Sequence, residues 1–313
     1  MKKQVLALFS ILLFGVSLQA QTSGDSVITF AIIGDFGSND SNERFVSNMV
    51  KSWNPDFIVT VGDNSYDNDE GENLKFNVGD YYGDYIYNPA YDKANTNKDG
   101  RAYKEKKNLF FTCLGNHDSK TEKSLENYQQ YFNAKNNYSL TWGPVSLYFF
   151  DSGKDSHNNG NGKFSDATLQ TIRTWLHQPN PDNNFRLVFF HHPPHTCGAP
   201  NPRITSMIDF DTLHVDAVIT GHEHLYERLK HTNNQKLPLY VVCGSGGANL
   251  TEDKYIDQAN TGPDFSNVVF DNKHFGAIKA SIITTGKVKT IYFEYYIVDG
   301  KGSRLEDRYY IQK

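Results

Sequence analysis

Five short segments of this chain each place a metal-binding type of side chain directly after an apolar, strand-like run. In chain order they are Gly34–Gly37, Gly62–Tyr66, Gly115–Asp118, Val188–His191 and Gly221–His224. In open α/β sheets, functional groups gather in the crevice outside the carboxyl ends of the strands, so loops distant in sequence converge there. The pattern therefore predicts a metal site that is assembled from five loops.

The side chains that these segments offer are oxygen and nitrogen donors without a thiolate. They are Asp35, Asp63, Tyr66, Asn116, His191, His222 and His224. Imidazole suits zinc, iron, copper and nickel, whereas carboxylate and amide oxygens suit harder ions. A tetrahedral zinc takes only about four ligands, so this larger set indicates two ions about 3.5–4 Å apart that share a carboxylate, as in phosphoester hydrolases. Asp63 is the expected bridge.

The five motifs together resemble the purple acid phosphatase branch of the calcineurin-like metallophosphoesterase superfamily. That branch carries DxG, GDxxY, GNH(D/E), VxxH and GHxH in this order, and all five are present between Asp35 and His224. Other members of the superfamily have a metal-binding His at the position of Gly37. The purple branch lacks that His and supplies a tyrosine instead, which is Tyr66 here. The resemblance implies an α/β fold, a four-layer αββα sandwich of two mixed sheets flanked by helices.

The resemblance also implies how the ligands divide between two metal ions. Asp35, Asp63, Tyr66 and His224 would hold the first ion, and Asp63, Asn116, His191 and His222 the second. The first ion is expected to be Fe(III), whose bond to the phenolate gives the purple colour. A highly charged ion can deprotonate a phenol despite its usual pKa of about 10. The second ion is Fe(II), Zn or Mn across the family.

The reaction implied is hydrolysis of phosphate monoesters, by attack of a hydroxide that the metal ions activate. His117 matches the family's His that contacts the phosphate and protonates the leaving group. His195 is a second candidate for substrate contact, supported only by its place in the run from His191 to His195. Two alternatives stay open. One is a metal-dependent phosphodiesterase or nucleotidase of the same fold, and the other is a catalytically silent metal-binding protein.

Three further polar residues of these segments have simpler interpretations. His192 either orients a metal ligand or packs beneath the Pro193-Pro194 turn. Asp118 is interpreted as a turn residue or a residue behind the ligands, and Glu223 as a residue without a metal role.

The beginning of the chain predicts export. A basic start, an apolar run over Val5–Val16 and the small residue Ala20 are typical of a secretory signal peptide over residues 1–20. The run is too short to span a bilayer comfortably, so we expect a secreted or periplasmic protein without a membrane partner. The formal net charge of −5 gives no electrostatic case for nucleic acid. The expected partners are small phosphorylated substrates, and the oligomeric state is not predicted.

Residues 21–313 are expected to form one metallophosphoesterase domain, which is near the upper size for a single core. Apolar periodicity predicts helices, and two longer alternating runs predict a β-hairpin. The helices are expected at Asn42–Ser52, Glu122–Phe132, Asp166–His177 and Thr205–Leu213, and the hairpin strands at Phe275–Thr284 and Val288–Val298.

Two features leave their roles open. The tyrosine-rich segment 67–107 has little periodicity, and it is either an ordered loop over the mouth of the site or a loop packed on the outer surface. Of the three cysteines, Cys113 and Cys243 lie in strand-like runs and are expected to be buried thiols. Cys197 lies in a loop and is expected to be the more reactive one.

Overall fold

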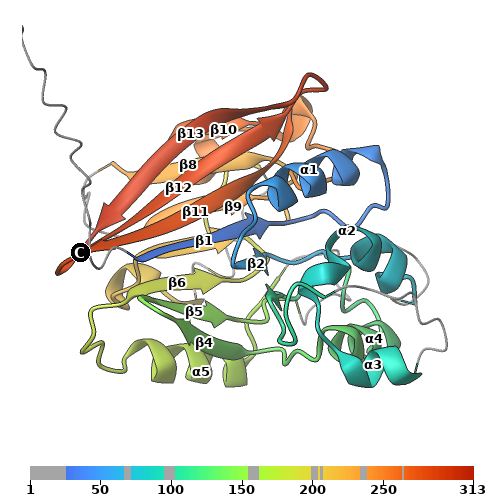
Figure 1. Cartoon of the computed structure of the whole chain (residues 1–313). Coiled ribbons are helices and arrows are strands. Elements are labelled where there is room, and N and C mark those ends of the chain that lie inside the picture. The colour runs from blue at the N-terminus through green and yellow to red at the C-terminus, as the bar shows by residue number, and fades with distance from the viewer. Residues whose placement is uncertain are drawn as a thin grey trace, which may run out of the picture.

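The structure, a computed structural model, consists of two β-sheets with helices around them (Figure 1). It describes residues 26–66, 72–94, 103–153, 162–198, 204, 207–232, 238–262 and 264–313. The expected signal peptide, residues 1–20, lies outside this part of the chain. Among the helices of the described residues, none is both long and apolar enough to cross a membrane.

The first sheet is mixed and has the strand order β13-β12-β11-β1-β2-β3. Its strands are β1 (Ser26–Ile33), β2 (Phe57–Thr60), β3 (Phe110–Phe111), β11 (Phe275–Thr285), β12 (Val288–Val298) and β13 (Ser303–Gln312). β1, β2 and β3 pair in parallel, whereas β11, β12 and β13 add antiparallel pairs. The expected hairpin is confirmed as β11 and β12.

The second sheet is also mixed, in the order β10-β8-β9-β7-β6-β5-β4. Its strands are β4 (Tyr138–Trp142), β5 (Val145–Phe149), β6 (Phe185–Phe189), β7 (Ala217–Thr220), β8 (Tyr226–His231), β9 (Leu239–Cys243) and β10 (Phe265–Asp271). β5, β6, β7 and β9 are parallel. In both sheets, the strands that precede the five motifs therefore run in parallel and end at a common edge.

The helical segments connect these strands. They are α1 (Ser41–Ser52), the π-helix η1 (Lys75–Gly79), α2 (Asp80–Tyr82), α3 (Pro89–Ala94), α4 (Glu122–Phe132), α5 (Asp166–Leu176) and the 3₁₀ turns η2 (Gly83–Tyr85), η3 (Phe210–Thr212), η4 (Asp253–Tyr255) and η5 (Gln258–Thr261). In Figure 1, α1 lies on the outer side of the first sheet and α5 lies beside β4 and β5 of the second. The predicted sandwich of two mixed sheets flanked by helices is confirmed.

Local capping explains where the main helices begin. The Asp40 side chain accepts hydrogen bonds from the backbone N–H groups of Asn42 and Glu43 at the start of α1. At α4, Thr121 and Ser124 form a reciprocal capping box. Each cap satisfies N–H groups that have no partner inside the helix. The helix predicted over Glu122–Phe132 is confirmed with the same bounds.

Two expectations from the sequence are corrected. Of the helix expected at Thr205–Leu213, the structure describes residues 207–213. Met207 is helical, the next two residues are not, and the 3₁₀ turn η3 follows, capped by the Asp209 side chain, which accepts from Asp211 N. Cys197, expected to be the more reactive thiol, is completely buried. It packs with Leu225 and Val242, so this loop is folded into the protein. All three cysteines are buried, and none of them forms a disulfide with another cysteine.

The described part of segment 67–107 is ordered, and its aromatic rings belong to the core. Tyr81, Tyr82 and Tyr85 are all buried. The Tyr82 ring packs edge-on against Phe36, 5.6 Å between ring centroids, and also contacts Phe110. These rings therefore pack under the loop that follows β1. This position differs from both expected roles, a loop over the mouth of the site and a loop on the outer surface.

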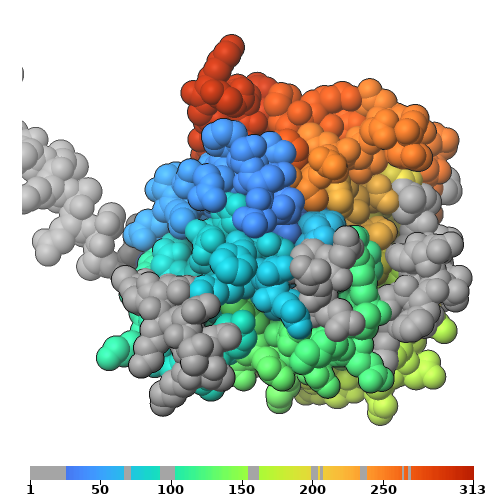
Figure 2. Space-filling model, turned by 90° about the vertical axis from the view of Figure 1, so that its right-hand side faces the viewer, coloured from blue at the N-terminus to red at the C-terminus, as the bar shows by residue number. Residues whose placement is uncertain are grey.

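One cluster of buried apolar side chains includes residues of both sheets, such as Phe30 on β1 and Phe189 on β6. This continuity agrees with a single domain over 21–313, which stays a prediction. Figure 2 shows the face toward which the arrows of β1 and β2 point in Figure 1. There, blue and cyan atoms from the first third of the chain lie between orange C-terminal and green segments.

Candidate metal centre

Each candidate ligand follows a strand by only a few residues, and three of them have an unusual backbone. Asp35 follows β1, Asp63 follows β2 and His222 follows β7, with φ angles of 54°, 50° and 71°. Left-handed backbone is uncommon for residues other than glycine, and it persists only where the surroundings enforce it. The same sharp turn after three strands directs side chains toward one place.

Two glycines permit the close approach of these loops. A Cβ at Gly37 would lie 1.9 Å from the backbone oxygen of Asn64, so this backbone has no room for a side chain there. Gly62 has a φ of 98°, and a Cβ there would lie 2.6 Å from His191 Nδ1. The absence of a His at position 37 is therefore built into the packing of the first loop against the second.

Three of the candidate ligands meet at one end of the site. The Tyr66 hydroxyl donates to Asp35 Oδ1 at 3.1 Å and lies 2.9 Å from His224 Nε2. His224 Nε2 is itself 3.4 Å from Asp35 Oδ1. Residues from the first, second and fifth motifs thus present one phenol, one carboxylate and one imidazole to a common point.

The other candidate ligands form an adjoining group. Asn116 Oδ1 lies 3.0 Å from His191 Nε2 and 3.0 Å from His222 Nδ1. His191 Nε2 is 3.4 Å from Asp63 Oδ1 and 4.0 Å from Asp35 Oδ1. Asp35, Asp63 and His191 each offer a donor atom within 4.8 Å of the others. The structure therefore brings all seven predicted ligands together in two touching groups, with Asp63 and His191 at the junction.

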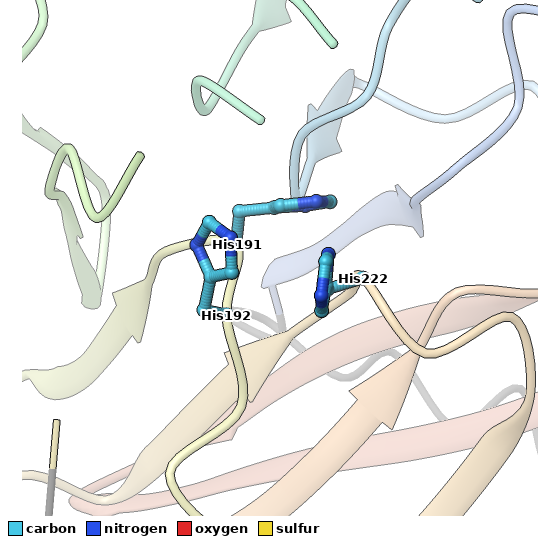
Figure 3. A group of neighbouring side chains, drawn as sticks. All are labelled: His191, His192 and His222. Atoms are coloured by element: carbon cyan, nitrogen blue, oxygen red, sulfur yellow. The ribbon is translucent and has the colours of Figure 1, made fainter. Parts of the chain in front are cut away.

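Histidines on the two neighbouring strand ends also lie close together (Figure 3). His191 and His192 follow β6, and His222 follows β7, with 4.4 Å between the ring centroids of His192 and His222. Donor atoms of these three residues lie within 4.8 Å of one another. His192 Nδ1 is 3.1 Å from the hydroxyl of Ser152, which lies in the loop after β5. This contact holds the His192 ring beside the site.

The far nitrogen of two ligand rings is fixed by backbone carbonyls. His191 Nδ1 lies 2.8 Å from the oxygen of Val61, and His224 Nδ1 lies 2.6 Å from that of Asn249. Such bonds set the tautomer and leave Nε2 available to a metal ion. Sequence reasoning could not find these partners, because a backbone carbonyl gives no residue-type signal.

Asp118 ties the second and third loops together. Its Oδ1 accepts from Asn64 N at 3.0 Å, and its Oδ2 accepts from Asn64 Nδ2 at 2.8 Å and from Gly115 N at 2.8 Å. Asn64 directly follows Asp63, and Gly115 directly precedes Asn116. One buried carboxylate therefore sets the spacing between two candidate ligands. The sequence analysis interpreted Asp118 either as a turn residue or as a residue behind the ligands, and the structure shows the second.

The charge balance of the site requires added positive charge. Asp35 and Asp63 are buried, and among the described residues no Lys or Arg side chain pairs with either of them. Burial by itself lowers the pKa of His191, but the negative charges of Asp63 and Asp35 and the hydrogen bonds of the ring together outweigh it and raise the pKa to about 9.

His224 behaves in the same way. Burial lowers its pKa, the hydrogen bond with Asp35 raises it, and the result is about 9. By contrast, burial and the charge of His191 lower the pKa of His222 to about 3. Without cations, protons on two rings balance the carboxylates. Metal ions would replace those protons, because a ligating imidazole is neutral. The donor set and its charge thus fit two cations.

His117 lies at the edge of this cluster. Its backbone N–H donates to Asp63 Oδ1 at 2.8 Å, and its Nε2 is 4.0 Å from Asp63 Oδ2. The side chain is 29% exposed, so the ring can be reached from solvent. Nδ1 is buried and has no hydrogen-bond partner among the described residues. Burial lowers the pKa of this ring. The position suits contact with a bound substrate, and its catalytic role stays a prediction.

His195 lies in a different environment. Its ring packs at a tilt of 31° against Phe265 with 3.8 Å between centroids and also contacts Tyr240. Among the contacts recorded for the described residues, none joins His195 to a candidate ligand. The structure therefore does not bring it together with the other predicted site residues, and its proposed contact with substrate stays a prediction.

The sequence was compared with known protein families. A sequence model of the calcineurin-like phosphoesterases matches residues 28–226, which include all five motifs. The chain belongs to the calcineurin-like phosphoesterase family. This family comprises metal-dependent hydrolases of phosphoesters, and its members bind two metal ions. A search of curated proteins found none that matches.

Solved structures are similar to this chain at low sequence identity. One is GAP50, described as the anchor in the inner membrane complex of Plasmodium, with 15% identity over 90% of this chain and 88% of that chain and a TM-score of 0.57. Another is a dimetal phosphatase from Danio rerio, with 15% identity over 91% of this chain and 98% of that chain and a TM-score of 0.49. At such identities the likeness concerns the fold alone.

Proposed function

We propose that this member of the family is an exported acid phosphatase of the purple type, which hydrolyses phosphate monoesters at a binuclear metal centre. The observation that carries this proposal is the position of Tyr66. Its hydroxyl lies within hydrogen-bonding distance of both Asp35 and His224, while position 37 has no space for the His that other family members use. The purple branch lacks the His of the first motif and has a Tyr in the second. The packing at Gly37 and the position of Tyr66 support both features.

The proposed ligands are those predicted from the sequence. Asp35, Tyr66 and His224 would hold Fe(III), and Asn116, His191 and His222 would hold Fe(II), Zn or Mn, with Asp63 between the two ions. Burial and the nearby charge of Asp35 raise the pKa of Tyr66 well above its usual value in the metal-free protein. Only a strongly charged ion would stabilise the phenolate there, which supports a trivalent ion.

The chain's own residues then have separate tasks. Cations at such a site supply Lewis acidity and lower the pKa of water near them. Asp118 and the backbone oxygen of Val61 keep the ligand loops and the His191 ring in register. His117 would contact the phosphate and donate a proton to the leaving oxygen, since its ring is the partly exposed imidazole beside the cluster.

A panel of three substrates tests the proposed specificity. Protein purified from its own host would be assayed with nitrophenyl phosphate, bis-nitrophenyl phosphate and AMP, together with elemental analysis and a visible spectrum. We expect the monoester to be hydrolysed fastest, with two metal ions per chain and a band from the phenolate. A much faster diester or nucleotide reaction would favour the phosphodiesterase or nucleotidase alternative. Absence of turnover in metal-replete protein would favour the silent metal-binding protein.

Export is a separate part of the proposal. We expect the protein to occur in the secreted or periplasmic fraction of its host, with a mature N-terminus close to residue 21. Cell fractionation followed by N-terminal sequencing tests this. Recovery of a full-length chain from the cytoplasm would contradict it without affecting the chemistry proposed for the site.

A further inference from the structure

A second pocket lies outside the metal-ligand cluster. It has a volume of about 380 Å³ and is lined by residues that follow β6, precede β7 and belong to β8, β9 and β10. This volume is within the usual range for small-molecule sites, which are about 300–1,000 Å³ and commonly aromatic. None of the candidate metal ligands lines it.

Four aromatic rings in mutual contact form part of its wall. They are His195, His231, Tyr240 and Phe265. The His231 and Phe265 ring centroids are 4.2 Å apart, and those of Tyr240 and Phe265 are 5.4 Å apart. Tyr and Phe rings, here Tyr240 and Phe265, attract cations through their negative faces, and clusters of such rings recognise ammonium groups.

Carboxylates line the polar side of the pocket. Asp209, Asp211 and Asp264 line it, and no Lys or Arg is among the described residues that do so. Burial and the charge of the neighbouring His231 lower the pKa of His195 to about 4, so this ring carries no charge at neutral pH. Such a pocket repels phosphate and attracts a cation.

One buried nitrogen in the pocket lacks a hydrogen bond. The His231 side chain is only 9% exposed, and its Nε2 makes no hydrogen bond among the described residues. The nearest carboxylate oxygen, Asp211 Oδ1, lies 3.3 Å away in an ion-pair contact that lacks hydrogen-bond geometry, and it accepts a hydrogen bond from the Tyr240 hydroxyl at 2.8 Å. A polar group of a bound molecule would satisfy this nitrogen, since buried polar atoms usually have a partner.

A metal ion fits this pocket less well than an organic cation. Within the described residues, groups of three His, Cys, Asp or Glu donor atoms that lie within 4.8 Å of one another occur only at the metal centre. The pocket is also much larger than a single ion, and aromatic rings form part of its wall. We propose that it binds a small organic cation, an alkylammonium compound with a polar hydroxyl, at a site separate from the metal centre.

Choline chloride is a suitable probe for this site. Isothermal titration calorimetry of the purified, metal-containing protein would compare it with 3,3-dimethyl-1-butanol, the uncharged compound of the same shape, at matched ionic strength. We expect choline to bind and the neutral alcohol to bind markedly more weakly. Equal binding of both compounds, or no binding of choline at millimolar concentration, would overturn the proposal.

Charge variants locate the binding. The double variant Asp209→Asn/Asp264→Asn removes two of the three charges but keeps an oxygen that can cap η3. We expect each lost charge to weaken choline binding roughly twofold to fivefold, as for charge pairs near the surface. Asp182→Asn removes an exposed charge elsewhere and should leave the affinity unchanged.

Circular dichroism and thermal melting would establish that both variants fold. If the double variant binds choline as tightly as the unmodified protein, the pocket is not the binding site. If the Asp182→Asn variant weakens binding as much as the double variant does, a general loss of charge explains the effect, and the proposal is wrong. Neither outcome depends on phosphatase activity, so the proposed function is tested independently.

Discussion

Replacing Asp118 by Asn tests whether the carboxylate behind the ligands sets the geometry of the metal centre. Asp118 accepts three N–H hydrogen bonds, from the backbone and side chain of Asn64 and from Gly115 N. These donors belong to the loops that carry Asp63 and Asn116. An amide of the same shape has only one accepting oxygen, so the variant cannot accept from Asn64 N with a second oxygen as the carboxylate does.

The magnitude follows from counting the donors. If the amide oxygen takes the place of Oδ2, it keeps the bonds from Asn64 Nδ2 and Gly115 N and the longer bond from Asn64 N at 3.2 Å, but its NH₂ group replaces the acceptor Oδ1 that lies 3.0 Å from Asn64 N. The buried NH₂ group then has a donor opposite it instead of an acceptor, which costs about 1–3 kcal/mol. The melting temperature should fall by roughly 2–10 °C. Because this residue positions ligands indirectly, metal affinity should fall by about 10- to 100-fold.

The assay is competition for metal with a chelator, together with thermal melting, at pH 8. Burial and the charge of Asp63 raise the pKa of Asp118 to about 7, so the unmodified carboxyl is mostly ionised under these conditions. Asp307→Asn is the matched control. Asp307 is also a buried carboxylate, and it accepts hydrogen bonds from Arg228 and from the Tyr226 hydroxyl, each at 2.7 Å, rather than from the loops that carry Asp63 and Asn116.

The control variant should be less stable but should bind metal normally. The positioning role is contradicted if Asp118→Asn loses stability to a similar extent while its metal affinity stays unchanged. In that case Asp118 would contribute only to the fold.

Three further predictions concern the metal centre itself. Tyr66→Phe should abolish the visible band and weaken the ion beside Asp35, and an unchanged spectrum would exclude a phenolate ligand. His117→Ala should lower kcat by about 10²–10⁴-fold, as for lost acid–base assistance, with metal content intact by elemental analysis; undiminished turnover would remove this His from the mechanism. The raised pKa values of about 9 for His191 and His224 mean that the metal-free fold binds extra protons. Its melting temperature should therefore be highest below pH 6.5 and fall toward pH 9, and a constant or rising value would contradict these pKa shifts.

The sequence by itself determined which loops carry the chemistry. Asp35, Asp63 and His222 each follow an apolar run, and parallel strands end at one edge of a sheet, so side chains after those runs must converge. The start of α4 is determined locally as well, because Thr121 and Ser124 form its cap within four residues. Information of this kind lies in short segments, where spacing and residue type are enough.

Tertiary structure decided the contacts that cross large distances in sequence. Asp118 reaches back to Asn64, and the His191 ring is held by the carbonyl of Val61, which is 130 positions away. His195 lies close to the ligand His191 in sequence but packs on Phe265 in a separate pocket. Residue types do not indicate which backbone carbonyl will contact a side chain, nor in which direction a loop will run. Only the packing of strands against one another brings such atoms together, because that packing depends on the whole core.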